Sequence, residues 1–137
     1  MRICYHNHAF EFEPLGEQTP FEVMIERFDP QLTAFEVDVF WVSITGNNPV
    51  EILKRLKGRV PMIHLKDLAK GAASRYNQNV APGEFSEVGS GTVDFAAILR
   101  QAPDTGVKHY FVEQDQTPGD PVDSLRQSYK YLRSLEV

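Results

Sequence analysis

The sequence has one cysteine, Cys4, among 137 residues. A single cysteine excludes a disulfide within the chain and a zinc site built from several thiolates. Because Cys4 lies inside a short apolar run, we expect it to be a small buried hydrophobic residue rather than a nucleophile.

The chain also has few basic residues and no long hydrophobic run. Its 14 Lys and Arg are scattered and are outnumbered by 19 Asp and Glu, which gives a net charge of −5. Nucleic-acid-binding surfaces normally concentrate positive charge, so we expect no nucleic-acid partner. No stretch reaches the roughly 20 apolar residues of a membrane span, and Arg2, His6 and His8 interrupt the segment where a signal peptide would lie. We therefore expect no membrane partner and a cytoplasmic location.

Four helices are predicted from their first residues. An N-cap residue followed by proline occurs at Thr19-Pro20, Asn48-Pro49 and Asp120-Pro121, and a fourth helix is expected to begin at Asp94. In the last helix the apolar residues recur at spacings of three and four, at Val122, Leu125, Tyr129 and Leu132. This spacing predicts an amphipathic helix that docks this stripe on the core.

Four short apolar runs, at 3–5, 35–37, 60–63 and 110–112, alternate with these helices. The order predicts an α/β fold with a parallel sheet, because no two runs are placed to form a hairpin. With 42% hydrophobic residues, we expect residues 1–137 to form a single domain. The glycine-rich segment from 68 to about 92 reads as an irregular functional loop over the carboxyl ends of the strands.

Four βα units are half of a (β/α)₈ barrel, which typically needs about 250 residues. A half-barrel leaves two sheet edges unpaired. The sequence thus predicts half of a TIM barrel that is completed either by another chain or by a missing N-terminal half. Self-association through the open sheet edges is the expected outcome.

Each apolar run stops at a side chain that can bind a divalent metal. The first ends at His6 with His8 just beyond, and the others end at Asp38, His64 and Glu113. The carboxyl ends of parallel strands lie together on one face, so these groups can meet. Imidazole and carboxylate ligands suit Mn, Fe, Co, Zn or Mg. His6 and His8 are equal candidates for the first ligand.

Three further residues belong to the same face. Trp41 is either core or an apolar wall for a sugar ring. Glu36 lies two residues before Asp38 and points the same way, so it needs a partner inside the barrel. Lys66 could be that partner or could contact substrate, whereas Asp67 is expected either to hydrogen-bond to a metal ligand or to cap the backbone.

Other polar residues have simpler expected roles. Glu11 and Glu13 read as solvated loop carboxylates, and His109 reads as a surface residue at the opposite end of the sheet. Gly89-Ser90-Gly91 could bind phosphate, but two glycines are weak support for that, and we expect them to shape the turn before Asp94.

Five segments together resemble the C-terminal half, strands five to eight, of the xylose-isomerase-like TIM barrels, the family of sugar phosphate isomerases and epimerases. They are Tyr5-His6-Asn7-His8, the segment 36–41, His64-Leu65-Lys66-Asp67, the segment 88–95 and Val112-Glu113. The resemblance implies a small-molecule carbohydrate substrate and a divalent metal held by Asp38, His64 and Glu113. His6 stands where many relatives have a glutamate and would be the fourth ligand.

The resemblance also sets the expected chemistry. Family isomerases use two glutamates as acid and base, and only Glu113 is in place here, so a histidine, His6 or His8, would act on the other side. Isomerisation or epimerisation through an enediolate is the leading hypothesis, and dehydration or lysis of a sugar or cyclitol is a close variant. An inactive half-barrel that serves as an assembly module is the non-enzymatic alternative. Phosphodiester hydrolysis, as in related endonucleases, is disfavoured by the acidic charge.

Overall fold

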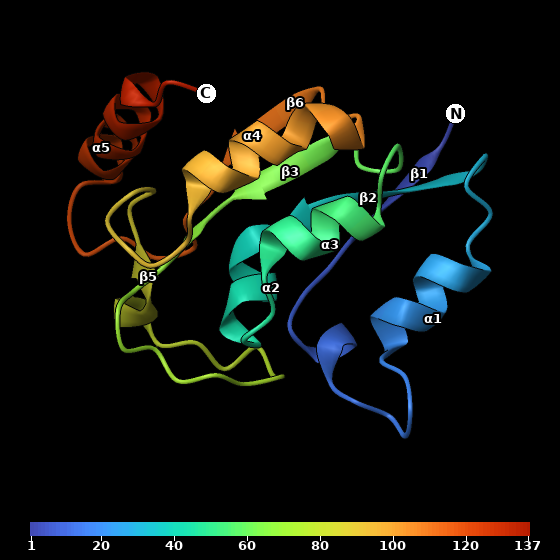
Figure 1. The fold of residues 1–137 in the computed structure, drawn as a ribbon. Helices are drawn as coiled ribbons and strands as arrows, with labels where there is room; N and C mark the ends of the chain where they lie inside the picture. The colour runs from blue at the N-terminus through green and yellow to red at the C-terminus, as the bar shows by residue number, and fades with distance from the viewer.

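The computed structural model describes residues 1–137 and contains a four-stranded parallel sheet with helices packed against it (Figure 1). The strands β1 (Ile3–His6), β2 (Thr33–Asp38), β3 (Met62–Leu65) and β6 (His109–Val112) lie in the order β1-β2-β3-β6. All three pairings are parallel. The predicted α/β fold, parallel (β/α) units forming half of a TIM barrel, is confirmed.

The predicted helices are α1 (Pro20–Arg27), α3 (Pro49–Arg55), α4 (Phe95–Thr105) and α5 (Pro121–Ser134). Each begins where its capping residue stands, because that side chain accepts a hydrogen bond from a backbone N–H of the first turn. The capping residues are Thr19, Asn48, Asp94 and Asp120. All four predicted starts are confirmed.

The main hydrophobic core lies between the sheet and the helices α1, α3 and α4. Strand residues such as Phe35, Val37 and Ile63 point toward these helices and are fully buried. Successive side chains of a strand alternate between faces, so Glu36, Asp38 and His64 lie on the other face. That face is the inner surface of the half-barrel, and it carries the polar groups.

Helix α5 differs from the expectation. Its stripe residues Val122, Leu125 and Tyr129 are 61%, 51% and 63% exposed, and of the four only Leu132 packs on the core. The helix instead buries Ser124 and Ser128. The predicted docking of the whole stripe is wrong, because the sheet ends at β6 and offers no surface beneath the stripe.

The segment 68–92 is also more ordered than predicted. Strands β4 (Asp67–Leu68) and β5 (Phe85–Ser86) pair in antiparallel fashion, and the 3-10 turn η2 (Pro82–Glu84) precedes β5. This short antiparallel ladder lies outside the four predicted strands, which pair only in parallel as expected. A second unpredicted element is the short helix α2 (Val39–Ile44), which follows β2 directly.

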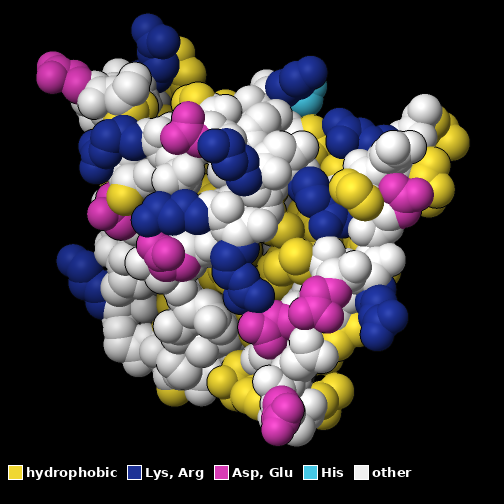
Figure 2. All heavy atoms as spheres, turned by 45° about the vertical axis from the view of Figure 1, so that its right-hand side comes forward, with side chains coloured by type: hydrophobic (Ala, Val, Ile, Leu, Met, Phe, Trp, Pro, Cys, Tyr) yellow, Lys and Arg dark blue, Asp and Glu magenta, His cyan; other side chains and the backbone are white.

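Charged side chains of both signs are interspersed on the face of the molecule drawn in Figure 2, with hydrophobic side chains open between them. Cys4 is only partly buried, contrary to the expectation, because β1 is an edge strand with no neighbour on one side. None of the helices is both long and apolar enough to cross a membrane.

Candidate active site

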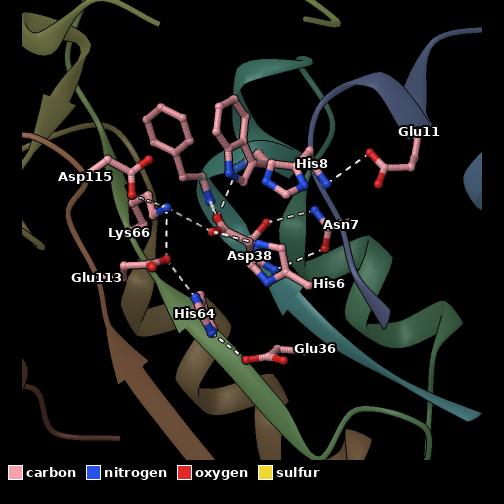
Figure 3. A network of polar contacts seen from close by, with 12 residues as sticks. His6, Asn7, His8, Glu11, Glu36, Asp38, His64, Lys66, Glu113 and Asp115 are labelled. Carbon is pink, nitrogen blue, oxygen red and sulfur yellow. Dashed lines mark hydrogen bonds and ion pairs between the residues drawn. The ribbon is translucent and has the colours of Figure 1, made fainter. Parts of the chain in front are cut away.

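Three predicted ligands meet at the carboxyl ends of β1, β2 and β3. His6, Asp38 and His64 each offer one ligand atom, and these atoms all lie within 4.8 Å of one another. The Nε2 atom of His6 is 3.8 Å from Oδ2 of Asp38 (Figure 3). The parallel pairing of Asp38 with His64 and of His6 with Glu36 brings these strand ends together.

Asp38 is the deepest member of this cluster. Its Oδ1 accepts N–H bonds from Phe40 at 2.9 Å and Trp41 at 3.2 Å, so the carboxylate also caps α2. Its Oδ2 is buried and has no hydrogen-bond partner. Burial raises the pKa of Asp38 to about 6, against the opposing effects of Lys66 and the Trp41 amide.

Asn7 joins the ends of β1 and β2. Its amide Nδ2 donates to the Asp38 carbonyl at 3.2 Å, and its Oδ1 accepts the Asp38 N–H at 3.1 Å. Both residues are fully buried. Asn7 therefore fixes His6 relative to Asp38, a role that its place between two candidate histidines could have suggested.

Glu11 is buried, not solvated as expected, whereas Glu13 is exposed as expected. The turn η1 (Phe10–Phe12) brings the Glu11 carboxylate back to β1. There it accepts the Tyr5 hydroxyl at 2.7 Å and the His8 N–H at 3.0 Å. Burial and this hydrogen bond raise the pKa of Tyr5 to about 12.

His64 lies between two carboxylates. Its Nε2 is 2.5 Å from Oε1 of Glu36, and its Nδ1 is 2.8 Å from Oε2 of Glu113. Burial alone would lower the pKa of His64, but the hydrogen bonds with Glu113 and Glu36 outweigh it and raise the pKa. The partner that Glu36 needs is thus His64, and the suggestion that Lys66 pairs with Glu36 is wrong.

Lys66 is buried among three other carboxylates. Its Nζ lies 2.9 Å from Glu113, 2.9 Å from Asp115 and 3.4 Å from Asp38. Burial opposes the charged form, but Asp38 and its other acidic neighbours raise the pKa of Lys66. Asp115 was not expected here; its only sequence signal is its spacing of two from Glu113, which keeps both side chains on one side of an extended segment.

A cavity of about 370 Å³ opens above these groups. It is lined by His6, His8, Trp41, Lys66, Gln78, Val80, Phe85, Glu113, Asp115 and Gln116. Trp41 is both core and wall, since it is only 5% exposed yet lines the cavity. Gln78, Val80 and Phe85 come from the segment 68–92, which lies over the site as expected.

The two histidines after β1 have different positions. His6 belongs to the ligand cluster, whereas His8 packs beside His6 and Trp41, with ring centroids 5.0 and 5.2 Å away. Burial lowers the pKa of both imidazoles, and each is lowered further by a neighbouring histidine. His109 is exposed at the opposite end of β6, as expected.

Glu113 lies beside the cluster rather than within it. Burial acts to raise its pKa, but hydrogen bonds from His64 and Lys66 outweigh burial and lower the pKa. Its carboxylate is 2.8 Å from Nδ1 of His64, close enough to contact an ion held by the cluster if it gives up this hydrogen bond.

The turn Gly89-Ser90-Gly91 is filled by Asp67. The buried Asp67 carboxylate accepts the Gly89 and Gly91 N–H groups at 2.9 and 2.8 Å and also the N–H groups of Leu68, Thr92 and Val93. A Cβ on Gly91 would lie 2.4 Å from Oδ1 of Asp67, so only glycine fits there. The turn thus has the structural role that we expected.

The cluster fits a divalent metal. Two imidazoles and one carboxylate are a nitrogen and oxygen donor set typical of such sites. The Oδ2 atom of Asp38 is a buried acceptor without a hydrogen bond; it lies 3.4 Å from Nζ of Lys66 and 3.8 Å from Nε2 of His6. One nitrogen of His64 would have to release its carboxylate partner to coordinate an ion.

No family model matches the chain. It is 28% identical to the inosose dehydratase of Clostridium botulinum (strain Eklund 17B / Type B), over 97% of this chain and 47% of that protein. A sugar phosphate isomerase/epimerase from Parabacteroides distasonis ATCC 8503 is 26% identical over 96% of this chain and 45% of its own, with a TM-score of 0.76. A xylose isomerase domain protein from Planctomyces limnophilus has a TM-score of 0.71 at 19% identity over 96% of this chain and 45% of its own, which shows the fold alone. The chain spans about half the length of the curated relatives it matches.

Proposed function

With the fold of half a xylose-isomerase-like TIM barrel as the premise, we propose that the protein is a divalent-metal-dependent enzyme of carbohydrate metabolism. It acts on the carbon beside a carbonyl of a sugar or cyclitol and proceeds through an enediolate. The observation that carries this proposal is the convergence of His6, Asp38 and His64 within 4.8 Å, with Glu113 alongside.

His6, Asp38 and His64 would hold the ion, with Glu113 as the fourth ligand; Mn, Co, Zn, Mg and Fe all suit this donor set. When bound, the ion would polarise the carbonyl and stabilise the negative charge of the enediolate. The remaining tasks fall to side chains that line the cavity.

Glu113 is the proposed base for the α-proton. Its lowered pKa keeps it ionised near neutral pH, and its contact with Lys66 fixes its carboxylate. His8, or His6 if it does not hold the ion, would exchange a proton on the other side, since burial lowers the pKa of both and leaves an uncoordinated imidazole able to accept one. Lys66 would hold a substrate oxygen, and Trp41 would pack against the ring.

The fate of the enediolate decides the reaction. Return of the proton at another carbon gives isomerisation, and its return to the same carbon on the opposite face gives epimerisation. Loss of a β-hydroxyl gives dehydration. The inosose dehydratases among the relatives favour dehydration of a cyclitol, whereas the isomerase/epimerase structures favour the first outcome. Both outcomes require the same proton removal.

We also propose that two copies associate through their open sheet edges and close an eight-stranded barrel. Strands β1 and β6 each have a neighbour on one side only. This dimer would complete the barrel around the site. The non-enzymatic alternative, an inactive half-barrel that serves as an assembly module, would form the same dimer but would not catalyse a reaction.

Metal binding and proton removal can be tested in sequence. Calorimetry with Mn, Co and Zn should show binding to the parent and to His109→Ala, a control far from the site, but not to His64→Ala. The metal-loaded parent should exchange the α-proton of an inosose or ketose with solvent deuterium, and Glu113→Gln should not, because an amide cannot accept the proton. Equal metal binding by His64→Ala would refute the cluster, and normal exchange in Glu113→Gln would remove Glu113 from the base role.

A further inference from the structure

We infer that the cavity takes an uncharged polyhydroxy carbonyl compound and rejects its phosphate ester. This inference rests on the proposed function and names the class of substrate for it. Three observations carry it: the charges around the cavity, the occupied glycine turn, and the side chains that remain free to contact a ligand.

The charges around the cavity are mainly negative. Lys66 is the only ammonium or guanidinium group among the lining residues. It is already engaged by Asp38, Glu113 and Asp115, and Glu36 adds a fourth carboxylate to the network through His64. A divalent ion would still leave the carboxylates in excess by one charge, because the ligating imidazoles must be neutral.

A phosphate ester would bring about −1.5 to −2 further charges at pH 7. Protein sites bind phosphate through free Arg or Lys side chains or through unoccupied backbone N–H groups. The single positive charge of Lys66 is outnumbered by the three carboxylates beside it. Lys66 can therefore donate to a neutral oxygen, but a phosphate group would meet a net repulsion that the unphosphorylated compound avoids.

Backbone N–H groups are not available to bind a phosphate either. The glycine turn 89–91 stands after β5, in the region where many TIM barrels bind phosphate. Its N–H groups at Gly89 and Gly91 point at Asp67, which is buried and takes the place that a phosphate would take. A carboxylate already bound there excludes a second anion.

The groups that remain free suit a neutral ring. Gln78 and Gln116 line the cavity with amides that both donate to and accept from hydroxyl groups. Trp41, Val80 and Phe85 supply apolar surface for the C–H face of a ring. The cavity volume of about 370 Å³ lies within the range of small-molecule sites.

Matched pairs of probes test this inference on the full chain, with and without Mn. The pairs are D-fructose with D-fructose 6-phosphate, and D-xylulose with D-xylulose 5-phosphate, measured by calorimetry or saturation-transfer NMR. We expect each neutral member to bind about tenfold or more tightly than its ester, a difference of about 1.4 kcal/mol. Tighter binding of an ester, or binding of neither member of both pairs, would overturn the inference.

Asp115→Asn provides the second arm, because it removes one carboxylate from Lys66. Asp115→Asn should reduce the ratio of the affinity for the neutral probe to the affinity for its phosphate ester. The control Asp104→Asn, at an exposed position on α4, should leave this ratio unchanged. An unchanged ratio in Asp115→Asn would overturn the electrostatic argument. A neutral preference without any solvent exchange would refute only the proposed function, and turnover of a phosphate ester would refute only this inference.

Discussion

Asp38 uses its two carboxylate oxygens differently. Oδ1 caps α2, and Oδ2 faces the ligand cluster without a hydrogen bond. The ammonium of Lys66, 3.4 Å away, offsets only part of the cost of burying this oxygen without a hydrogen bond, and a buried acceptor of this kind lowers the stability of the folded protein. The same burial raises the pKa of Asp38, because it destabilises the ionised carboxylate relative to the protonated form.

Asp38→Asn should therefore stabilise the protein near neutral pH. The folded pKa of about 6 is above the ordinary value of 3.8, so the unfavourable contribution is complete above pH 6 and disappears as pH falls from 6 toward 3.8. At 1.36 kcal/mol per pKa unit, the gain at about pH 7.5 should be on the order of 1–3 kcal/mol. The amide oxygen can still cap α2.

Urea unfolding at about pH 7.5 and about pH 4.5 measures this effect. The gain should shrink at the lower pH, and the exposed control Asp104→Asn should show no gain at either. A variant that is less stable than the parent at both pH values would contradict the prediction.

The residues of the site were predictable in part. His6, Asp38 and His64 could be found because strand ends of a parallel sheet meet at one edge. Glu11 and Asp115 could not, because their burial and partners depend on how η1 and the segment after β6 fold back. Apart from the spacing of two between Glu113 and Asp115, the local sequence carries no signal for such contacts.

The same distinction holds for whole elements. Helix starts were predictable because the capping bonds join neighbouring residues. The pairing of β4 with β5 was not predictable, because each strand has only two residues. The ladder also depends on hydrogen bonds from the turn at 89–93 to the Asp67 carboxylate. Strands this short have no period that a sequence pattern can reveal.

Asp67→Ala should loosen this whole segment. It would remove the buried acceptor of five N–H groups, that of Leu68 on β4 and those of Gly89, Gly91, Thr92 and Val93 in the turn. We expect a loss of at least about 3 kcal/mol of unfolding free energy. Asp67→Asn keeps one acceptor oxygen and should lose less. Hydrogen exchange should rise at 88–93 but not in α1, and the exposed control Asp104→Ala should behave as the parent. Unchanged protection at 88–93 in Asp67→Ala would refute the role of this carboxylate.

At the scale of the molecule, two surfaces remain open that a barrel would close. Helix α5 and the edge strand β1 lie on opposite sides of the molecule (Figure 1). The stripe of α5, formed by Val122, Leu125 and Tyr129, is exposed, and Ile3 on β1 is 70% exposed. Ile3 lies on the same face as Tyr5, the face that the helices cover. A two-fold axis that sets β6 of each copy beside β1 of the other would bring the stripe of one copy over Ile3 of its partner.

Light scattering at about micromolar concentration should then show a dimer, because paired edges and the buried stripe replace exposed backbone and apolar surface. Leu125→Glu should shift the protein to monomer by placing a charge in the contact. Gln127→Glu carries the same new side chain on an exposed position of α5 outside the stripe and should remain dimeric. A compact, folded monomer of the parent would refute the two-copy barrel, and a dimer that survives in Leu125→Glu would show that α5 lies outside the interface.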